Sequence, residues 1–156
     1  ETAPSGPDEN MRVASLLLAL AALVVAVSAG TRPANATDLG TGCGGNCPGG
    51  CSKCPCGESS HYVSIADWCA KHSWDQKACR CIVSHESGGN ANAVNENSNG
   101  SFDVGLWQVN SMNWKACSGG RAPCDVETNL KCAIDVYRWG GNTFKLWSTC
   151  HVCGVC

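Results

Sequence analysis

The cysteine content constrains this chain more than any other feature of its sequence. The chain contains 14 cysteines among 156 residues. Near its start, Met11 and Arg12 precede an apolar run over 16–27, and small residues follow at 27–29. The run is shorter than the roughly 20 residues that a membrane-spanning helix needs. We therefore interpret 11–29 as a cleaved secretory signal, with an uncleaved anchor as the alternative. Export places the cysteines in an oxidising compartment, which predicts disulfide bonds.

Five cysteines are crowded into a Gly- and Pro-rich segment at 38–57, DLGTGCGGNCPGGCSKCPCG. Such a cluster could bind zinc, but export and the absence of a nearby histidine favour disulfides. No apolar periodicity is present, so the segment predicts a stapled knot or spacer with almost no core of its own. We expect four parts along the chain: upstream residues 1–10, the signal peptide 11–29, a Gly/Cys-rich stapled segment or linker 30–58, and one globular domain 59–156.

The charge balance argues against a protein that binds polyanions. Lys and Arg total 11, Asp and Glu total 13, and the two signs balance from residue 30 onward. All four histidines lie in that part, and histidine titrates at about pH 6.5. An acidic compartment would therefore make the chain positive and strengthen its attraction to an anionic target. We expect a monomer without cofactor or metal, whose partners include neither nucleic acid nor, after signal cleavage, a membrane.

Two amphipathic helices are predicted at the start of the globular domain. Ser64 can cap the first, whose inward positions follow at 65, 68, 69 and 72. Residues 73–76 fit a capping box for the second helix. The second helix has an inner face of Cys79, Ile82, Val83 and Glu86 and ends at Gly88-Gly89.

A hairpin and two further helices complete the predicted domain. Asn99-Gly100 is a strong hairpin-turn dipeptide and places a short strand on each side. Asp125 caps a helix over 125–137, which the glycine pair at 140–141 ends. A short last helix is expected to carry Phe144, Leu146 and Trp147. The sequence thus predicts an α+β fold, in which several helices surround a small antiparallel β-hairpin and disulfides staple them together.

Two carboxylates occupy unlike settings in this pattern. Glu86 lies on the apolar face of its helix, where loss of water penalises the charged form and keeps the group protonated near neutral pH. Asp103 follows the turn, among asparagines at 95, 97, 99 and 110 whose amide donors favour an ionised carboxylate. One protonated and one charged acid are what hydrolysis of a glycosidic bond requires. The alternative is a solvated Glu at a helix end and an ordinary hairpin Asp.

Two motifs resemble the C-type, or animal-type, lysozymes. The stretch 81–87, CIVSHES, is similar to the helix end that presents the catalytic Glu in that family, with a Cys five residues before the acid. The stretch 101–111, SFDVGLWQVNS, resembles the strand that carries the second carboxylate, and the seventeen-residue spacing from Glu86 to Asp103 agrees. The resemblance is close over 81–114 and looser over 62–150.

The resemblance implies a lysozyme-like fold and roles for the matching polar residues. Glu86 would be the general acid, and Asp103 would be the nucleophile or charge stabiliser beneath the sugar. Asn97 and Asn110 match positions that hydrogen-bond the second carboxylate or the sugar. Gln108 matches a residue that lines the floor of the cleft.

The resemblance also assigns two tryptophans and one disulfide. Trp114 matches a sugar-stacking Trp at the mouth of the cleft, with a core Trp as the alternative, and stacking suits an aromatic face that stays partly exposed. Trp147 matches a Trp that packs on the catalytic Glu. A bridge between Cys81 and Cys150 is implied, whereas the Cys-rich prefix has no counterpart in the family.

The function implied by the resemblance is that of a secreted muramidase, an antibacterial glycosidase that hydrolyses β-1,4 bonds of cell-wall glycan by a retaining mechanism. Its setting would be extracellular or the lumen of a phagosome or lysosome. The stretch 87–94 also resembles lytic transglycosylases, which would need Glu86 alone. A catalytically inactive glycan-binding protein of the same fold is the other alternative. Asp103 at the matching position favours hydrolysis.

Overall fold

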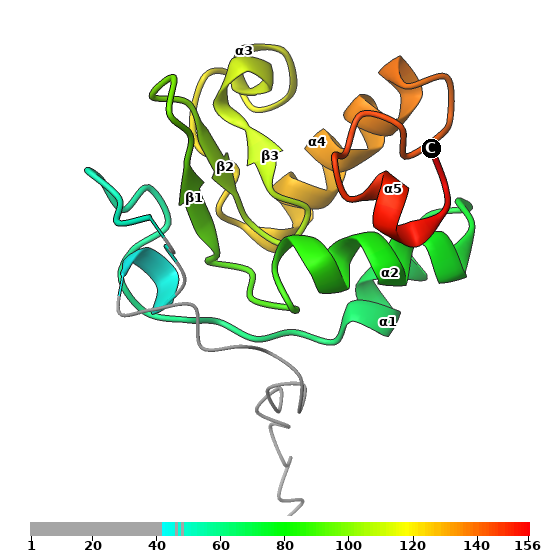
Figure 1. Ribbon diagram of the computed structural model, residues 1–156, viewed down its shortest axis with the longest axis horizontal. Helices are drawn as coiled ribbons and strands as arrows, with labels where there is room; N and C mark the ends of the chain where they lie inside the picture. Colours follow the sequence, from blue (N-terminus) through cyan, green and yellow to red (C-terminus); the bar gives the residue numbers. More distant parts are fainter. Residues whose placement is uncertain (1–41, 46, 48) are drawn as a thin grey trace, which may run out of the picture.

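The computed structural model describes residues 42–45, 47 and 49–156 (Figure 1). A small sheet stands on one side of the molecule, and the two longest helices, α2 (Gln76–Glu86) and α4 (Val126–Trp139), lie on the other (Figure 1). The upstream residues and the expected signal peptide fall outside the described residues. Among the helices that are described, none combines the length and hydropathy needed to cross a membrane.

Two of the predicted helix starts are confirmed. α1 (Ile65–Cys69) begins after Ser64, whose hydroxyl accepts a hydrogen bond from the backbone N–H of Asp67 at 3.3 Å. α4 begins after Asp125, whose carboxylate accepts from the backbone N–H of Thr128 at 3.0 Å. Both side chains satisfy a backbone donor that the first turn of a helix leaves without a partner.

The capping box expected at 73–76 is wrong. Asp75 caps α2, because its carboxylate accepts from the backbone N–H of Ala78 at 2.6 Å. The side chain of Gln76 points back instead and donates to the carbonyls of His72 and Trp74. A carboxylate interacts with the positive end of a helix more strongly than a hydroxyl does, so the helix starts two residues later than the box predicts.

The predicted hairpin forms the first two strands of a three-stranded antiparallel sheet. β1 (Val94–Glu96) pairs with β2 (Phe102–Val104), and β2 pairs with β3 (Val109–Asn110). The register places Asp103 between Asn95 on one side and Asn110 on the other. β3 was not predicted from the sequence, because two residues are too few to show an alternating pattern.

The last helix expected around residues 144–147 is wrong, and four short helices were missed. Residues 141–149 form turns that bury Phe144 and Trp147 against the core and leave Leu146 exposed. Gly141 and Asn142 have positive φ angles of 72° and 60°, which a helix cannot continue through. The short helices are η1 (Cys43–Gly45), η2 (Ser111–Asn113), α3 (Trp114–Cys117) and α5 (Cys150–Cys153).

All fourteen cysteines form disulfides, as the sequence analysis predicts. The implied Cys81–Cys150 bridge is wrong, because Cys81 pairs with Cys153 and Cys150 pairs with Cys156. The last seven residues contain three half-cystines, Cys150, Cys153 and Cys156, and sequence spacing alone could not choose between them. The other pairs are Cys43–Cys54, Cys47–Cys51, Cys56–Cys124, Cys69–Cys79 and Cys117–Cys132.

The described part of the Cys-rich segment is packed on the sheet rather than separated from it. Its buried half-cystines Cys43 and Cys47 share one apolar cluster with Val94 and Val104 of the sheet. The Cys56–Cys124 bridge ties the segment to the loop before α4, and the backbone N–H and hydroxyl of Ser52 donate to the carboxylate of Glu96. The apolar cluster that buries the half-cystines of this segment is therefore completed by side chains of the sheet.

The turns before and after β2 each contain a glycine, and we expect the two positions to differ in how well they tolerate alanine. Gly105 has a φ of 81°, and a Cβ atom there would collide with the side-chain amide of Asn129. Gly100 has a similar φ of 77° but open space around it. We expect Gly105→Ala to lower the free energy of unfolding by about 3 kcal/mol or more, and Gly100→Ala by about 1 kcal/mol. Denaturant unfolding of the oxidised variants measures both, and equal losses would contradict the close packing at Gly105.

Candidate active site

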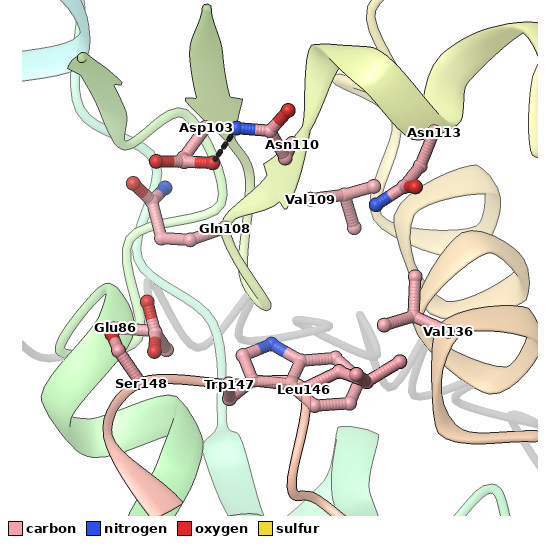
Figure 2. Close-up of a pocket in the computed structure, with 10 residues that line it drawn as sticks. All are labelled: Glu86, Asp103, Gln108, Val109, Asn110, Asn113, Val136, Leu146, Trp147 and Ser148. Carbon is pink, nitrogen blue, oxygen red and sulfur yellow. Dashed lines mark hydrogen bonds between the residues drawn. The ribbon is translucent and has the colours of Figure 1, made fainter. Parts of the chain in front are cut away.

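A pocket of about 240 Å³ lies between the sheet and the helices, and it contains both carboxylates singled out from the sequence (Figure 2). Glu86 enters it from the end of α2, and Asp103 enters it from β2. Figure 2 shows Glu86 at one side of the pocket and Asp103 across from it, with Gln108 between them in this view. Residues seventeen positions apart in sequence are thus brought to one cavity.

Glu86 is the last residue of α2 and lies on the helix face that packs against the core. The residues before it on the same face, Cys79, Ile82 and Val83, are fully buried. Desolvation raises the pKa of Glu86 from its ordinary value of 4.5 to about 7, against a hydrogen bond from Thr149 that lowers it, and the negative charge of Asp103 adds a smaller increase. The expectation of a Glu that holds its proton near neutral pH is therefore confirmed.

Asp103 is surrounded by amide donors, as the asparagine-rich sequence predicts. Its Oδ2 accepts from Asn97 Nδ2 at 2.7 Å and from Asn95 Nδ2 at 3.4 Å. Its Oδ1 accepts from Asn110 Nδ2 at 2.8 Å, the contact dashed in Figure 2. These donors come from β1, from β3 and from the turn that joins β1 to β2. The sheet itself therefore fixes the orientation of the Asp103 carboxylate.

Gln108 lines the pocket from the bend before β3. Its backbone has a φ of 48°, an unusual value for a residue with a side chain. The side-chain Nε2 donates to the carbonyls of Ala93 and Gly105 at 3.0 and 2.9 Å, which holds this bend in place. Gln108 thus lines the pocket with a side chain whose amide nitrogen is already engaged by the backbone.

The two tryptophans assigned by resemblance take different positions. Trp147 lines the pocket and is 6% exposed, and its Nε1 donates to the carbonyl of Trp107 at 2.8 Å. Figure 2 shows its ring on the same side of the cavity as Glu86. Trp114 is half-buried and donates to the carbonyl of Val109, and it is not among the pocket-lining residues, whereas the adjacent Asn113 is.

Thr149, which contacts Glu86 but does not itself line the pocket, and five of the lining residues were not predicted from the sequence. Thr149 donates its hydroxyl to Glu86 Oε1 at 2.6 Å. Nothing in the sequence around Thr149 indicated this contact, because 63 residues separate the partners. The other missed residues are Val109, Asn113, Val136, Leu146 and Ser148. Of these, Val136 could have been found, since it lies on the buried face of α4 three positions after Ala133.

Comparison with known proteins agrees with this geometry. Residues 75–149 match the model of a family described as a lysozyme-like domain. The part of the chain that forms the pocket is therefore similar to lysozyme-like domains. The matched range contains both carboxylates and all the polar residues described around them, and the resemblance and the disulfide-stapled α+β fold expected from sequence are confirmed.

Individual relatives point to the same family. The chain is 37% identical over 71 residues to "Lysozyme C" of Takifugu rubripes, covering 46% of this chain and 41% of that protein. It is 39% identical over 66 residues to "Lysozyme" of Bombyx mori, covering 40% and 46%, respectively. It is 34% identical over 87 residues to "Lysozyme X" of Drosophila melanogaster, covering 47% and 60%. The chain thus spans about half the length of the curated relatives that it matches.

The raised pKa of Glu86 predicts a pH dependence of stability. Between pH 4.5 and about 7 the folded state keeps a proton that the unfolded chain has released. The stabilisation is therefore complete below pH 4.5 and is lost as the pH rises to about 7, by up to about 3 kcal/mol.

Denaturant unfolding of the oxidised protein at a series of pH values measures this slope. We expect wild type to lose stability over this range and Glu86→Gln, which cannot ionise, to lack that part of the slope. Identical slopes in the two proteins would contradict the assignment of a raised pKa to Glu86.

Proposed function

We propose that this chain is a muramidase that hydrolyses the β-1,4 glycosidic bonds of bacterial peptidoglycan. The observation that carries the proposal is the pairing of two unlike carboxyl groups in one pocket. Burial raises the pKa of Glu86 to about 7, while Asp103 accepts three amide hydrogen bonds. A neutral acid and a hydrogen-bonded carboxylate in one cavity suit acid-catalysed cleavage of an acetal.

Glu86 would serve first as the acid. Near neutral pH it carries a proton that it can donate to the bridging oxygen as the bond to the sugar breaks. The pocket also contains the buried side chains of Trp147 and Val136, which limit competition from water. After the leaving sugar departs, the same carboxylate can accept a proton from the incoming water, which restores the acid.

Asp103 would stabilise the positive charge that develops on the sugar ring. The carboxylate either attacks the anomeric carbon to form a covalent intermediate or holds the oxocarbenium-like sugar as an ion pair, and water then completes the retaining reaction. The amides of Asn97 and Asn110 fix the direction of the carboxylate, so little reorganisation is needed when the charge appears. Gln108 and Trp147 would form walls of the sugar-binding site. Trp114, the first residue of α3, would stack its ring against a sugar.

The biological setting follows from the same proposal. The partner would be cell-wall glycan, and a disulfide-bonded chain of this kind would act outside the cell or in the lumen of a phagosome or lysosome. The globular domain at 59–156 would carry the activity as a monomer. The role of the preceding segment would be to brace the sheet that bears Asp103.

Product analysis on purified peptidoglycan tests the two carboxylates. We expect wild type to release reducing muramic acid ends, and Glu86→Gln and Asp103→Asn each to lower the rate about 100-fold or more while remaining folded. Glu127→Gln is the matched control, because Glu127 is an exposed acid in the first turn of α4. Its activity should equal that of wild type.

Three other results would overturn the proposal. Anhydro ends that survive Asp103→Asn would indicate a lytic transglycosylase that uses Glu86 alone. Glycan binding by wild type without any product would indicate a binding protein of the same fold. Full hydrolysis by Glu86→Gln would remove that residue from the role of acid.

A further inference from the structure

The hydroxyl of Thr149 contacts the carboxyl group that the proposed reaction needs. Its Oγ1 donates to Glu86 Oε1 at 2.6 Å, a short hydrogen bond between a residue at the end of α2 and one at the start of α5. Both side chains are partly buried. A hydrogen bond to a carboxylate in such surroundings is stronger than in water, because few solvent molecules compete for it.

The backbone holds Thr149 in place independently of this contact. The residue is the N-cap of α5, and its carbonyl accepts from the backbone N–H of Cys153 at 3.1 Å. The hydroxyl makes no capping hydrogen bond to the helix. The hydroxyl can therefore donate to Glu86 without giving up a capping hydrogen bond. Its removal should leave the start of α5 intact.

A disulfide fixes the distance between the two helices that carry the pair. Cys81 of α2 is bonded to Cys153 of α5. Cys81 lies five positions before Glu86, and Cys153 lies four positions after Thr149. The bridge thus holds the hydroxyl over the carboxyl group, and the Cys150–Cys156 bridge closes the end of the chain beside it.

The hydrogen bond acts on one of the two protonation states of Glu86. Donation to Oε1 favours the carboxylate and opposes the desolvation that favours the acid. Asp103 on β2 is the charged group that acts on Glu86 across the pocket, and it favours the acid. The other titratable side chains on α2, the segment 141–149 and α5 are exposed: Lys77, Arg80, His85, Lys145 and His151.

We propose that Thr149 is a positioning residue for Glu86: its hydroxyl orients the carboxyl group and stabilises the ionised form that exists after the proton has been donated. This inference rests on the proposed function. The proton passes from Glu86 to the bridging oxygen, and the hydroxyl keeps its own proton throughout while its hydrogen bond shortens around the new charge. Thr149 therefore sets how readily the acid gives up its proton.

Thr149→Val tests the inference, because valine keeps the shape of threonine and lacks the hydroxyl. Two readouts are needed on the oxidised full chain: the titration of the Glu86 carboxyl carbon by NMR, and the pH dependence of kcat and KM on peptidoglycan. We expect the titration midpoint and the basic limb of the rate profile to rise by about one pH unit, a tenfold gain in proton affinity. We also expect kcat below the midpoint to fall about tenfold with KM unchanged.

Three companion variants separate this role from a structural one. Thr149→Ser keeps the hydroxyl and should restore the wild-type midpoint, and Thr149→Ala should repeat the effect of valine if the valine variant folds poorly. Thr143→Val is the matched control, because the Thr143 hydroxyl donates to the Gly140 carbonyl at 2.8 Å in the same segment and does not touch Glu86. It should leave the midpoint unchanged.

The inference is overturned if the Glu86 midpoint stays in place, or falls, when the Thr149 hydroxyl is removed. An equal rise in Thr143→Val would overturn it as well, because the effect would then be a general loosening of the segment. The NMR titration needs no turnover. A wild type without muramidase activity would therefore defeat the proposed function, while the contact between Thr149 and Glu86 would still be decided by the titration.

Discussion

The side chain of Asn129 joins the two sides of the molecule. It is completely buried on α4, and its Nδ2 donates to the carbonyls of Val104 and Pro123 while its Oδ1 accepts from the backbone N–H of Trp107. Val104 is next to Asp103, and Trp107 is next to Gln108. The buried Asn129 amide, whose nitrogen and oxygen both form hydrogen bonds, thus holds the backbone next to Asp103 and Gln108 at a fixed position relative to the helices.

The pocket that results gives its two acids opposite environments. The helix side contributes packed apolar residues, and Glu86 at the end of that stripe has a pKa raised to about 7 by desolvation. The sheet side contributes amides, and Asp103 in the middle strand accepts hydrogen bonds from both neighbouring strands and the turn. The fold creates the asymmetry because the end of a packed helix and the middle strand of an asparagine-rich sheet are different surroundings for a carboxyl group.

The parts of the site that could be predicted are those determined by local pattern. The helical phase of Glu86 and the asparagines around Asp103 are visible in the sequence, and both environments were predicted correctly. The Cys81–Cys153 pairing and the contact from Thr149 depend on how α5 docks on α2, which no spacing reveals. The expected helix near Phe144 failed for a similar reason, because burial in the core decided the turns there rather than local propensity.

Folding alone makes Glu86 an acid of near-neutral pKa, because burial at the end of α2 disfavours its charged form. The most direct measurement is an NMR titration of the Glu86 carboxyl carbon in oxidised wild type, repeated after reduction and unfolding. We expect a midpoint at about 7 in the folded protein and a return toward the ordinary value of 4.5 in the unfolded chain. A folded midpoint near 4.5 would contradict the account, because Glu86 would then be ionised at neutral pH and could not donate the proton.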